Sequence, residues 1–423
     1  MKTTAKNMLE FINRSPSPFH TVNNLAGELT KAGFTRLYEG EKWQIKEGGK
    51  YFVIRNSSSV IAFIKGSEAP FMICASHSDF PSFRIKEESA GVYVRLATER
   101  YGGMILYSWF DRPLSIAGRV MVRTESGISE RLLDIDRDLL VIPSLAIHCQ
   151  PGVNDGFSPN AAVDLLPLLS TDKSVTLRGV LAEELSVKEE DILSHDLYLY
   201  AREKGSLVGA KEELIVSPRL DDLECVYTSL VSFLSAKSEG ATKVLAVFDN
   251  EEVGSQSKQG ADSTFLSDVL ERISENRESY LASLESSFMV SADNAHAKHP
   301  AHPEIADAQN APVLEGGVVI KYNANQRYTT DALSAAVFTE ICNKAGAKLQ
   351  SYRNRADKMG GSTLGSIANT QVSIPSIDIG LAQLAMHSAV ETAATSDAFE
   401  MVKALTKFYL TDLKIKGGEI VVK

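Results

Sequence analysis

The amino-acid sequence predicts an α/β fold: a mostly parallel central sheet with helices on both faces, interrupted by an inserted β-rich domain. Apolar strand-like runs alternate with amphipathic helical segments in the first and last parts of the chain, which is typical of parallel sheets. The run Phe71–Ser76 is almost continuously apolar, as in a strand buried on both faces. In the middle, short β-runs and glycine turns replace the alternation. We therefore expect one discontinuous domain over residues 1–86 and 214–423, and a β-rich domain over residues 87–213.

The N-terminal part begins with two amphipathic helices and continues with strands. Helices are predicted over Thr4–Asn13 and His20–Gly33, the second ending at its glycine. The short strands Lys50–Ile54 and Val60–Ile64 flank a polar stretch that indicates a hairpin turn. The apolar run Phe71–Ser76 follows.

The middle of the chain carries short β-runs divided by turns such as Gly102-Gly103. A loop rich in glycine, proline and asparagine, from Ile147 to Asn154, contains His148. The expected strands are Val92–Leu96, Met104–Tyr107, Ile116–Val122, Arg131–Asp134, Val175–Ala182 and Asp196–Tyr200.

Alternation of strands and helices returns after Ser217-Pro218. Because ligands of such sheets bind beyond the carboxyl ends of the strands, residues that directly follow a strand deserve weight as site candidates. The expected helices are Leu223–Ala236, Asp262–Ser274, Thr330–Gly346 and Ala389–Leu413; the expected strands are Val244–Phe248, Phe288–Ala292, Gly317–Tyr322 and Gln371–Ile379.

Composition excludes several classes of protein. The 423 residues carry a formal net charge of -10, which argues against nucleic acid or an anionic membrane as the main partner. The four cysteines show no CxxC spacing and are expected to be reduced, mostly buried thiols. The N-terminus lacks the apolar core of a signal peptide, and no stretch is apolar enough to span a membrane. We expect a cytoplasmic protein.

The stretch Lys243–Ser255, KVLAVFDNEEVGS, begins as a buried strand and ends in acidic residues. Glu251 and Glu252 are adjacent, and neighbouring residues of an extended chain point to opposite sides. The two carboxylates therefore suit two tasks: one binds a metal ion and the other transfers a proton. The alternative is an ordinary acidic turn.

Partners for such a metal-binding glutamate occur at other strand ends and loops. A lone histidine or a lone aspartate is more often a polar residue that begins a turn or faces solvent. Together, two histidines and three carboxylates on different elements of one sheet suit zinc, cobalt or manganese. The candidate ligands are His77, Asp221, Glu252, Asp293 and His387.

Five ligands exceed what one tetrahedral ion needs, so the set suggests two ions with Asp221 bridging them. Asp79, two residues after His77, is placed to orient the imidazole. Two ions can share a hydroxide and polarise a carbonyl together. Glu251 then remains free as the general base for the water and the general acid for the leaving amine.

At these residues the chain resembles the aspartyl aminopeptidase family of dinuclear zinc exopeptidases. The matching segments follow the family's order and cover nearly the whole chain. They are ASHSDFPSFRIK (75–86), IPSLAIHCQ (142–150), SPRLDDL (217–223), FDNEEVGS (248–255), SADNAHAKHP (291–300), VIKYNANQRY (319–328) and LAMHS (384–388).

The resemblance implies a zinc-exopeptidase fold whose β-rich insert makes dimer contacts within a twelve-subunit tetrahedral assembly. It implies that His77 and Asp293 hold one ion, that Glu252 and His387 hold the other, and that Asp221 bridges. Glu251 would be the general acid/base. His148 would reach a neighbouring subunit's active site and stabilise the oxyanion, whereas without the resemblance it is a plain loop residue.

The resemblance also places His296, Lys321 and Tyr328 in the substrate pocket, where a cationic Lys321 would suit an acidic substrate side chain. Without the resemblance, they are polar residues that face solvent at the end of a strand. Phe80 and Asp222 depart from the family pattern, as does the segment 355–363. A phenylalanine at position 80 near the site would favour neutral or apolar N-terminal residues.

We therefore expect a metal-dependent aminopeptidase that removes single N-terminal residues from peptides with two divalent ions per subunit. Zinc is the family's metal, and cobalt and manganese also tolerate the ligand set. An acidic preference follows from the resemblance. The alternatives are an aminopeptidase of broad or neutral specificity and, more remotely, a non-catalytic metal- or peptide-binding protein on the same fold.

Overall fold

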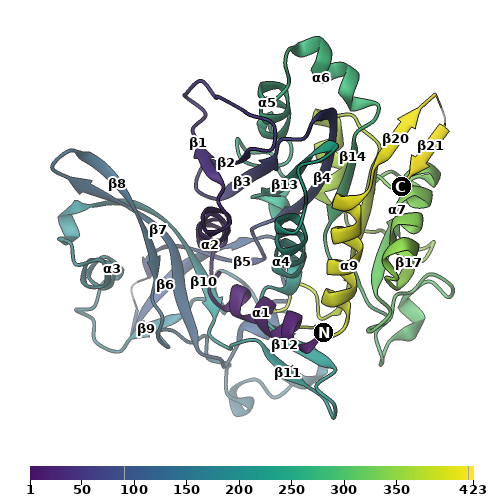
Figure 1. The fold of residues 1–423 in the computed structure, drawn as a ribbon. Coiled ribbons are helices and arrows are strands. Elements are labelled where there is room, and N and C mark those ends of the chain that lie inside the picture. Colours follow the sequence, from purple (N-terminus) through teal and green to yellow (C-terminus); the bar gives the residue numbers. More distant parts are fainter. Residues whose placement is uncertain (90, 418) are drawn as a thin grey trace.

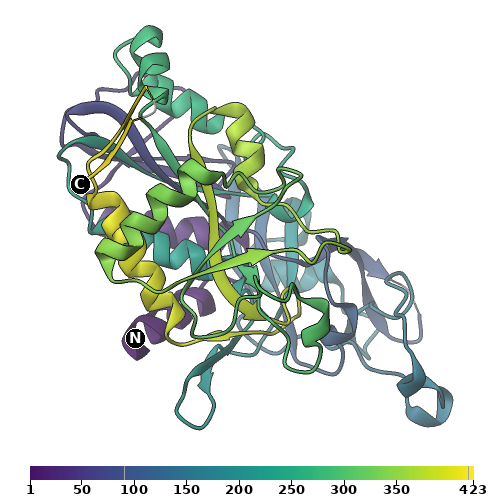
Figure 2. The ribbon, with the colours of Figure 1, turned by 90° about the vertical axis from the view of Figure 1, so that its right-hand side faces the viewer.

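The computed structural model describes residues 1–89, 91–417 and 419–423. A large mixed sheet carries helices on both faces, and a second, antiparallel sheet extends away from it on one side (Figures 1 and 2). This arrangement confirms the predicted α/β class. Among the described residues, none of the helices has both the length and the apolar composition required to cross a membrane.

The large sheet is parallel at its centre and mixed toward its flanks. Its four central strands run side by side in the order β13 (Ala241–Phe248), β4 (Glu68–His77), β14 (Phe288–Ala292) and β18 (Ser376–Leu384). The other strands are β1 (Thr35–Leu37), β2 (Lys50–Arg55), β3 (Ser59–Ile64), β11 (Ser206–Val208), β12 (Leu214–Ser217), β15 (Ala295–His296), β16 (Val318–Tyr322), β17 (Leu349–Arg353) and β19 (Glu391–Ala394).

Successive residues of the central strands pack against opposite helical layers. In β13, Leu245 and Val247 belong to one core, whereas Val244 and Ala246 belong to the other. The first layer contains α1 (Lys2–Asn13), α2 (Pro18–Lys31), α4 (Leu220–Leu234), α7 (Ala332–Ala345) and α9 (Asp397–Leu410). The second contains α5 (Phe265–Arg272), α6 (Arg277–Leu284) and α8 (Leu364–Gln371).

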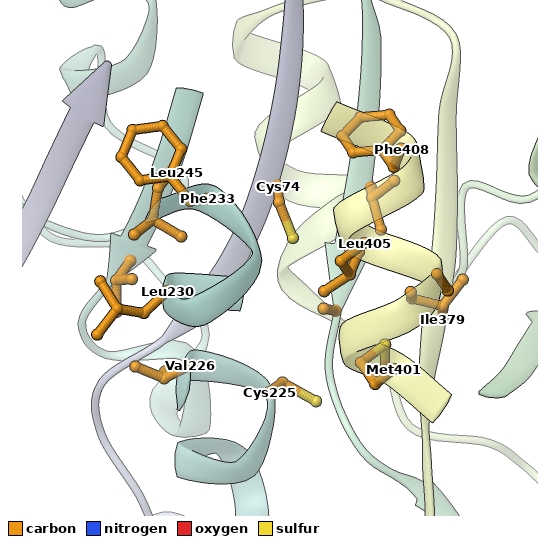
Figure 3. Packing of buried hydrophobic residues seen from close by; sticks show 14 of the residues in the cluster. Cys74, Cys225, Val226, Leu230, Phe233, Leu245, Ile379, Met401, Leu405 and Phe408 are labelled. Atoms are coloured by element: carbon orange, nitrogen blue, oxygen red, sulfur yellow. The ribbon is translucent and has the colours of Figure 1, made fainter. Parts of the chain in front are cut away.

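The first core is densest where α4 and α9 cover the sheet (Figure 3). Phe233 of α4 and Leu405 of α9 have no solvent exposure. Cys74 of β4 is also fully buried beneath these helices, as expected for a core thiol. Burial of each large side chain contributes about 1.5–3 kcal/mol, so this contact fixes the helices on the sheet that carries the site.

The second sheet is antiparallel and has its own core around Phe83, Trp109 and Leu197. Its strands, in spatial order, are β8 (Gly127–Asp134), β7 (Leu114–Thr124), β10 (Ile192–Ala201), β5 (Ser82–Ser89), β6 (Val94–Tyr101) and β9 (Leu168–Ser170). These strands lie between residues 82 and 201, and the division predicted at 86/87 and 213/214 stays a prediction. A C-terminal hairpin, β20 (Leu413–Lys416) and β21 (Glu419–Val422), completes the chain.

Two predicted strands of the insert are helical. The segment Val175–Ala182 was expected as a strand but contains the start of helix α3 (Leu177–Leu185), because the Thr176 hydroxyl caps the helix by accepting the Gly179 N–H. Leu177 and Leu181 then lie on one buried helix face. The segment Met104–Tyr107 ends in a 3-10 turn at Leu106–Trp109, which buries the Trp109 ring.

Two C-terminal predictions also placed elements wrongly. The long helix expected over Ala389–Leu413 is instead β19 followed by α9, because Glu391–Ala394 pairs with β12 at the sheet edge. The strand expected over Gln371–Ile379 starts only at Ser376, since α8 continues to Gln371. In both places, sheet pairing overrode the local pattern.

Candidate metal centre and active site

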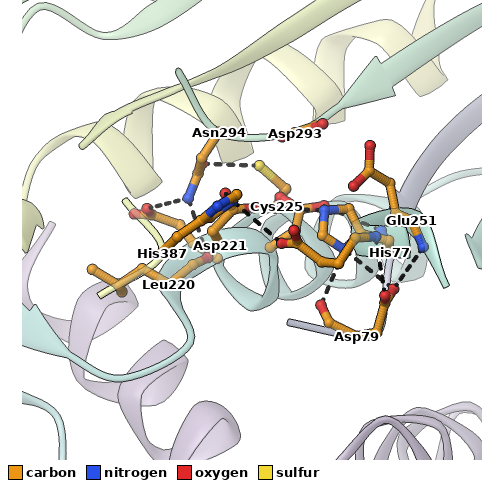
Figure 4. Close-up of polar contacts among 12 residues, drawn as sticks. His77, Asp79, Leu220, Asp221, Cys225, Glu251, Asp293, Asn294 and His387 are labelled. Carbon is orange, nitrogen blue, oxygen red and sulfur yellow. Dashed lines mark hydrogen bonds and ion pairs between the residues drawn. The ribbon is translucent and has the colours of Figure 1, made fainter. Parts of the chain in front are cut away.

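The predicted ligands meet at the carboxyl ends of the central strands (Figure 4). His77 is the last residue of β4 and pairs with Phe248, the last residue of β13. Asp293 directly follows β14, and His387 follows β18 with a left-handed φ of 66°. The short 3-10 turn Glu251–Val253 follows β13. Four parallel strands thus deliver donors to one place.

Asp221, in the first turn of α4, lies between the two histidines. Its Oδ1 is 3.5 Å from His77 Nε2, and its Oδ2 is 3.4 Å from His387 Nε2. His387 Nε2 is also 3.4 Å from Glu252 Oε1. Two donors bound at about 2.0–2.1 Å to one tetrahedral ion lie about 3.3–3.4 Å apart. These separations therefore match ligands that share an ion.

The donors form three overlapping clusters. Two of them share Asp221: His77, Asp221, Asp222 and Asp293 offer ligand atoms within 4.8 Å of one another, and so do Asp221, Glu252 and His387. The third consists of His77, Glu251 and Glu252. Asp221 belongs to the first two, as expected for a bridging carboxylate. Its buried Oδ1 has no hydrogen-bond partner among the described residues. The donor set and its geometry fit two divalent cations.

The ring orientation of both histidines is fixed by backbone carbonyls. His77 Nδ1 lies 3.0 Å from the carbonyl oxygen of Asp79, and His387 Nδ1 lies 2.5 Å from that of Gly103. In the neutral ring with Nδ1–H donating, Nε2 of each histidine carries a lone pair that can bind a metal ion. Asp79 therefore orients the His77 imidazole through its backbone carbonyl. Its carboxylate Oδ1 lies farther away, 3.5 Å from His77 Nδ1.

The carboxylate of Asp79 fixes the turn that carries the two glutamates. Its Oδ1 accepts the backbone N–H of Glu251 at 3.1 Å, and its Oδ2 accepts that of Glu252 at 3.2 Å. The Tyr101 hydroxyl, from the inserted sheet, donates to the same Oδ2 at 2.7 Å. The two glutamates consequently leave the turn in defined directions, which the residue types alone do not reveal.

Glu391 is a site-forming residue that the sequence reasoning missed. This carboxylate on β19 accepts the backbone N–H of His387 at 2.7 Å and the backbone N–H of Asp221 at 3.1 Å. It thereby ties the bridging ligand to a histidine ligand from a different element. Its place in the small-residue run ETAAT gave no sign of this role.

Asp222 was noted only as a departure from the family pattern, but it lies in the first cluster. Its Oδ2 accepts the backbone N–H of His77 at 3.1 Å. Burial raises the pKa of Asp222 well above its usual range, and Asp293 and Asp221 reinforce this rise. The side chain is placed as a neighbour of His77 that supports the end of β4.

Burial and mutual repulsion dominate the electrostatics of the carboxylates. Burial raises the pKa of Glu251 to about 8, opposed by His77 and reinforced by Asp293. Burial likewise raises the pKa of Glu252. For His387, burial lowers the pKa, but Asp221 and Glu252 raise it more strongly, and the pKa is about 10. So concentrated a negative charge favours cations, and divalent ions relieve it most strongly.

The other predicted residues lie around this centre in different ways. Lys321 is almost fully buried, and its Nζ donates to the carbonyls of Asp293 and Asn294 at 2.7 and 3.0 Å. Tyr328 is buried with its ring 5.2 Å from Lys321 Nζ. His296 is exposed three residues beyond Asp293. His148 lies in an exposed 3-10 turn and, in the described part of the chain, makes no hydrogen bond or ion pair to these residues.

The fold and the donor set define a metal-dependent enzyme whose site lies at the carboxyl edge of a parallel sheet. The family model described as "Aminopeptidase I zinc metalloprotease (M18)" matches residues 11–409. A "Probable M18 family aminopeptidase 2" from Clostridium acetobutylicum is 46% identical over 424 residues, covering 96% of this chain and 98% of that protein. One of the same description from Pseudomonas aeruginosa is 38% identical, covering 95% and 97%.

Solved structures agree with these sequence matches. A chain of the "Ape4 and Nbr1 complex" superposes with a TM-score of 0.93 at 37% identity, covering 96% of this chain and 85% of that chain. A "mApe1 dodecamer" from S. cerevesiae gives 0.84 at 26% identity, covering 97% of each chain. The chain belongs to the M18 family of metallo-aminopeptidases, as its resemblance implied.

Proposed function

We propose that this protein is a two-metal aminopeptidase that removes single N-terminal residues from peptides, with a preference for acidic ones. The observation that carries the two-metal part is Asp221, whose two oxygens each face a different histidine at 3.4–3.5 Å. A carboxylate in this position links two ions rather than completing one site.

His77 and Asp293 would hold the first ion, Glu252 and His387 the second, and Asp221 both. When bound, the ions supply a Lewis acid for the scissile carbonyl and lower the pKa of the attacking water. The chain fixes the donors through the carbonyls of Asp79 and Gly103 and through the carboxylates of Asp79 and Glu391. Positioning of this kind is usually a large part of metal-site function.

Glu251 would transfer the proton. It leaves the turn next to Glu252 and shares a cluster of donors with His77 and Glu252, but not with Asp221. Burial raises the pKa of its carboxyl, a direction that favours uptake of a proton by this group. It would accept the proton of the attacking water and deliver it to the leaving amine.

A cationic hollow beside the centre supports the acidic preference. It has a volume of about 340 Å³ and lies along the residues that precede His387 and follow Asp293. Its cations outnumber Asp307, the one carboxylate in its wall, although the whole chain is acidic. The cationic residues are Lys298, Arg353, Arg355 and Lys358.

Phe80 is the residue whose exposure near the site would favour neutral substrates. Its ring is 4% exposed and packs against the Arg219 guanidinium, so it offers little surface to a substrate. This burial favours the acidic reading over the neutral alternative. Lys321 would affect the preference for acidic residues only indirectly, because its Nζ donates to the backbone carbonyls of Asp293 and Asn294.

We also propose a dodecamer built from dimers, by analogy with the S. cerevesiae mApe1 dodecamer. The loop of His148 exposes the apolar side chains of Leu145 and Ile147, at 59% and 47%. Exposed apolar side chains on both sides of His148 favour a contact with a second subunit at this loop. In that contact His148 would donate to the oxyanion of the neighbouring site.

Exchange of Glu251 for Gln tests the proton transfer. We expect Glu251→Gln to retain its two equivalents of zinc and to lose at least about a hundredfold in kcat. Glu252→Gln is the matched control, and it should lose metal as well as activity. Retention of near-normal turnover by Glu251→Gln would refute the assignment, and one equivalent of zinc in the wild-type protein would refute the two-metal site.

Chromogenic substrates with N-terminal Asp, Glu, Ala, Leu and Lys test the specificity. We expect the highest kcat/KM with Asp or Glu, and a selective loss of that preference in an Arg353→Gln/Lys358→Gln variant. Equal loss for all substrates, or higher kcat/KM for Leu in the wild type, would support the broad or neutral alternative. Absence of cleavage in every metallated form would favour the non-catalytic alternative.

A further inference from the structure

Asn294 is a buried carboxamide that directly follows the candidate ligand Asp293. Its Oδ1 accepts the backbone N–H of Leu381 at 3.3 Å, and Cys225 Sγ lies 3.2 Å from the same oxygen (Figure 4). Its Nδ2 donates to the backbone carbonyl of Leu220 at 3.1 Å. One side chain therefore joins the segment after β14 to α4 and β18, and all three carry or precede candidate ligands.

The surroundings of Asn294 select an amide over a carboxylate, because the partners of Nδ2 are oxygen atoms. Besides the Leu220 carbonyl, these partners are Gln383 Oε1 at 3.0 Å and Glu224 Oε2 at 3.4 Å. An aspartate at this position would direct an oxygen, which cannot donate when ionised, toward the same acceptors. The position therefore requires a side chain that donates on one side and accepts on the other.

Gln383 extends this contact toward the second histidine of the metal centre. It is 1% exposed, and its Nε2 donates to Glu391 Oε1 at 3.4 Å. The same Oε1 accepts the backbone N–H of His387, and the other oxygen of Glu391 accepts that of Asp221. Asn294, Gln383 and Glu391 thus form a continuous chain of buried hydrogen bonds between the backbones that carry the candidate ligands.

The backbone at Asn294 is held as closely as its side chain. Lys321 Nζ donates to the carbonyls of Asp293 and Asn294. Gly380 of β18 lies against the same segment, where an added Cβ would be 2.0 Å from the Asp293 carbonyl oxygen. The segment is thereby fixed against β18 through its backbone, and the side chain of Asn294 fixes it against α4.

We propose that Asn294 and Gln383 are positioning residues of the metal centre. Asn294 holds Asp293 at a fixed separation from Asp221, and Gln383 connects this pair to the loop of the second histidine. The proposal rests on the proposed two-metal site. Apolar side chains of the same shape would fill this volume at little cost, so the buried amides serve hydrogen-bond geometry rather than packing alone.

Zinc affinity and the spectrum of the cobalt-loaded protein test this role. Gln383→Met removes the amide, keeps a side chain of similar length, and leaves Asn294 its hydrogen bond to the Leu220 carbonyl. Outer hydrogen bonds of metal centres typically contribute about 10–100-fold to affinity or activity. We expect a loss of zinc affinity in this range, measured by competition with a chelator, and a change in the visible d–d bands after loading with cobalt. Asn294→Asp should lose more affinity than Gln383→Met.

Gln44→Met, at an exposed glutamine, is the matched control and should keep the zinc affinity and cobalt spectrum of the wild type. Urea unfolding of the metal-free proteins measures stability separately. If Asn294→Asp does not fold, Gln383→Met decides. Wild-type zinc affinity and cobalt spectrum in Gln383→Met, whatever its stability, would overturn the positioning role and leave the two-metal site intact. A wild-type protein that binds no zinc would overturn both.

Discussion

The Tyr101 hydroxyl donates a hydrogen bond to Asp79 Oδ2 over 2.7 Å, and this contact joins the inserted sheet to the turn of the two active-site glutamates. Tyr101 also accepts a hydrogen bond from Asn250 Nδ2 at 2.8 Å. A tyrosine at the end of β6 thus supports Asp79 and the residue before Glu251 at once. The inserted sheet therefore contributes a hydrogen bond to the candidate metal centre within one subunit.

Tyr101→Phe should therefore impair the site without unfolding the insert. The variant keeps the ring, which packs edge-on against Tyr198 with centroids 5.3 Å apart, and removes only the hydroxyl. Outer hydrogen bonds of metal centres typically contribute about 10–100-fold to affinity or activity. We expect a loss of this size in kcat or in zinc affinity, measured by steady-state assays and by competition with a chelator. Tyr107→Phe, at a 69% exposed tyrosine of the insert, is the control; equal effects in both variants would count against the role of Tyr101.

Removal of the Glu391 carboxylate should loosen two segments: the loop that carries His387 and the first turn of α4, which carries Asp221. Glu391→Ala leaves the buried N–H groups of Asp221 and His387 without their acceptor, at a cost of about 1–3 kcal/mol for each unsatisfied group. We expect zinc affinity to fall by about tenfold or more and the free energy of unfolding to fall by about 2–5 kcal/mol. Isothermal titration with zinc and urea unfolding measure the two effects. Glu183→Ala on the exposed face of α3 should change neither.

Two leucines of helix α9 provide a paired test of the core. Leu405 is fully buried against the sheet, whereas Leu410 is 44% exposed. Leu405→Ala should lower the free energy of unfolding by about 2–5 kcal/mol, because a cavity remains beneath the helix. Leu410→Ala should cost less than about 1 kcal/mol. Urea denaturation of the zinc-loaded proteins measures both, and a small effect at Leu405 would contradict the packing in Figure 3.

His20 should make stability fall as the solution becomes acidic. Burial lowers the pKa of His20 to about 4 from 6.5, with a further contribution from Arg219, while Ser17 Oγ lies 2.8 Å from its Nδ1. The unfolded chain therefore binds a proton between pH 6.5 and 4 that the folded chain does not. The contribution of neutral His20 to the free energy of unfolding is fully present above pH 6.5. It decreases progressively below that pH, and roughly 2 kcal/mol is lost at pH 5.

A His20→Gln variant isolates this effect from other titrating groups. Urea unfolding at pH 7.5 and 5.0 should show a decrease in stability that is about 2 kcal/mol smaller in the variant than in the wild type. Identical decreases in the two proteins would show that His20 titrates equally in the folded and unfolded states.

The sequence alone determined the donors and their approximate arrangement. Parallel strands must end at one edge, so the residues after Phe71–Ser76, Val244–Phe248 and Phe288–Ala292 were bound to meet. The predicted division of tasks between Glu251 and Glu252 assumed an extended chain, whereas the structure places both residues in the 3-10 turn Glu251–Val253, so that division stays a prediction. The meeting of the donors follows from chain direction, which a sequence encodes directly.

Only the tertiary structure decided how the donors are held. Glu391 holds the backbone N–H of Asp221, and the backbone carbonyl of Gly103 holds His387; a backbone N–H or carbonyl leaves no trace in residue identity. Tyr101 holds the Asp79 carboxylate, which is 22 residues away in the sequence. The burial of Arg219 is equally invisible in the segment SPRLDDL, because it depends on what the insert and the sheet bring around the side chain. Local chemistry therefore follows from the sequence, whereas desolvation and long-range hydrogen bonding follow from the fold.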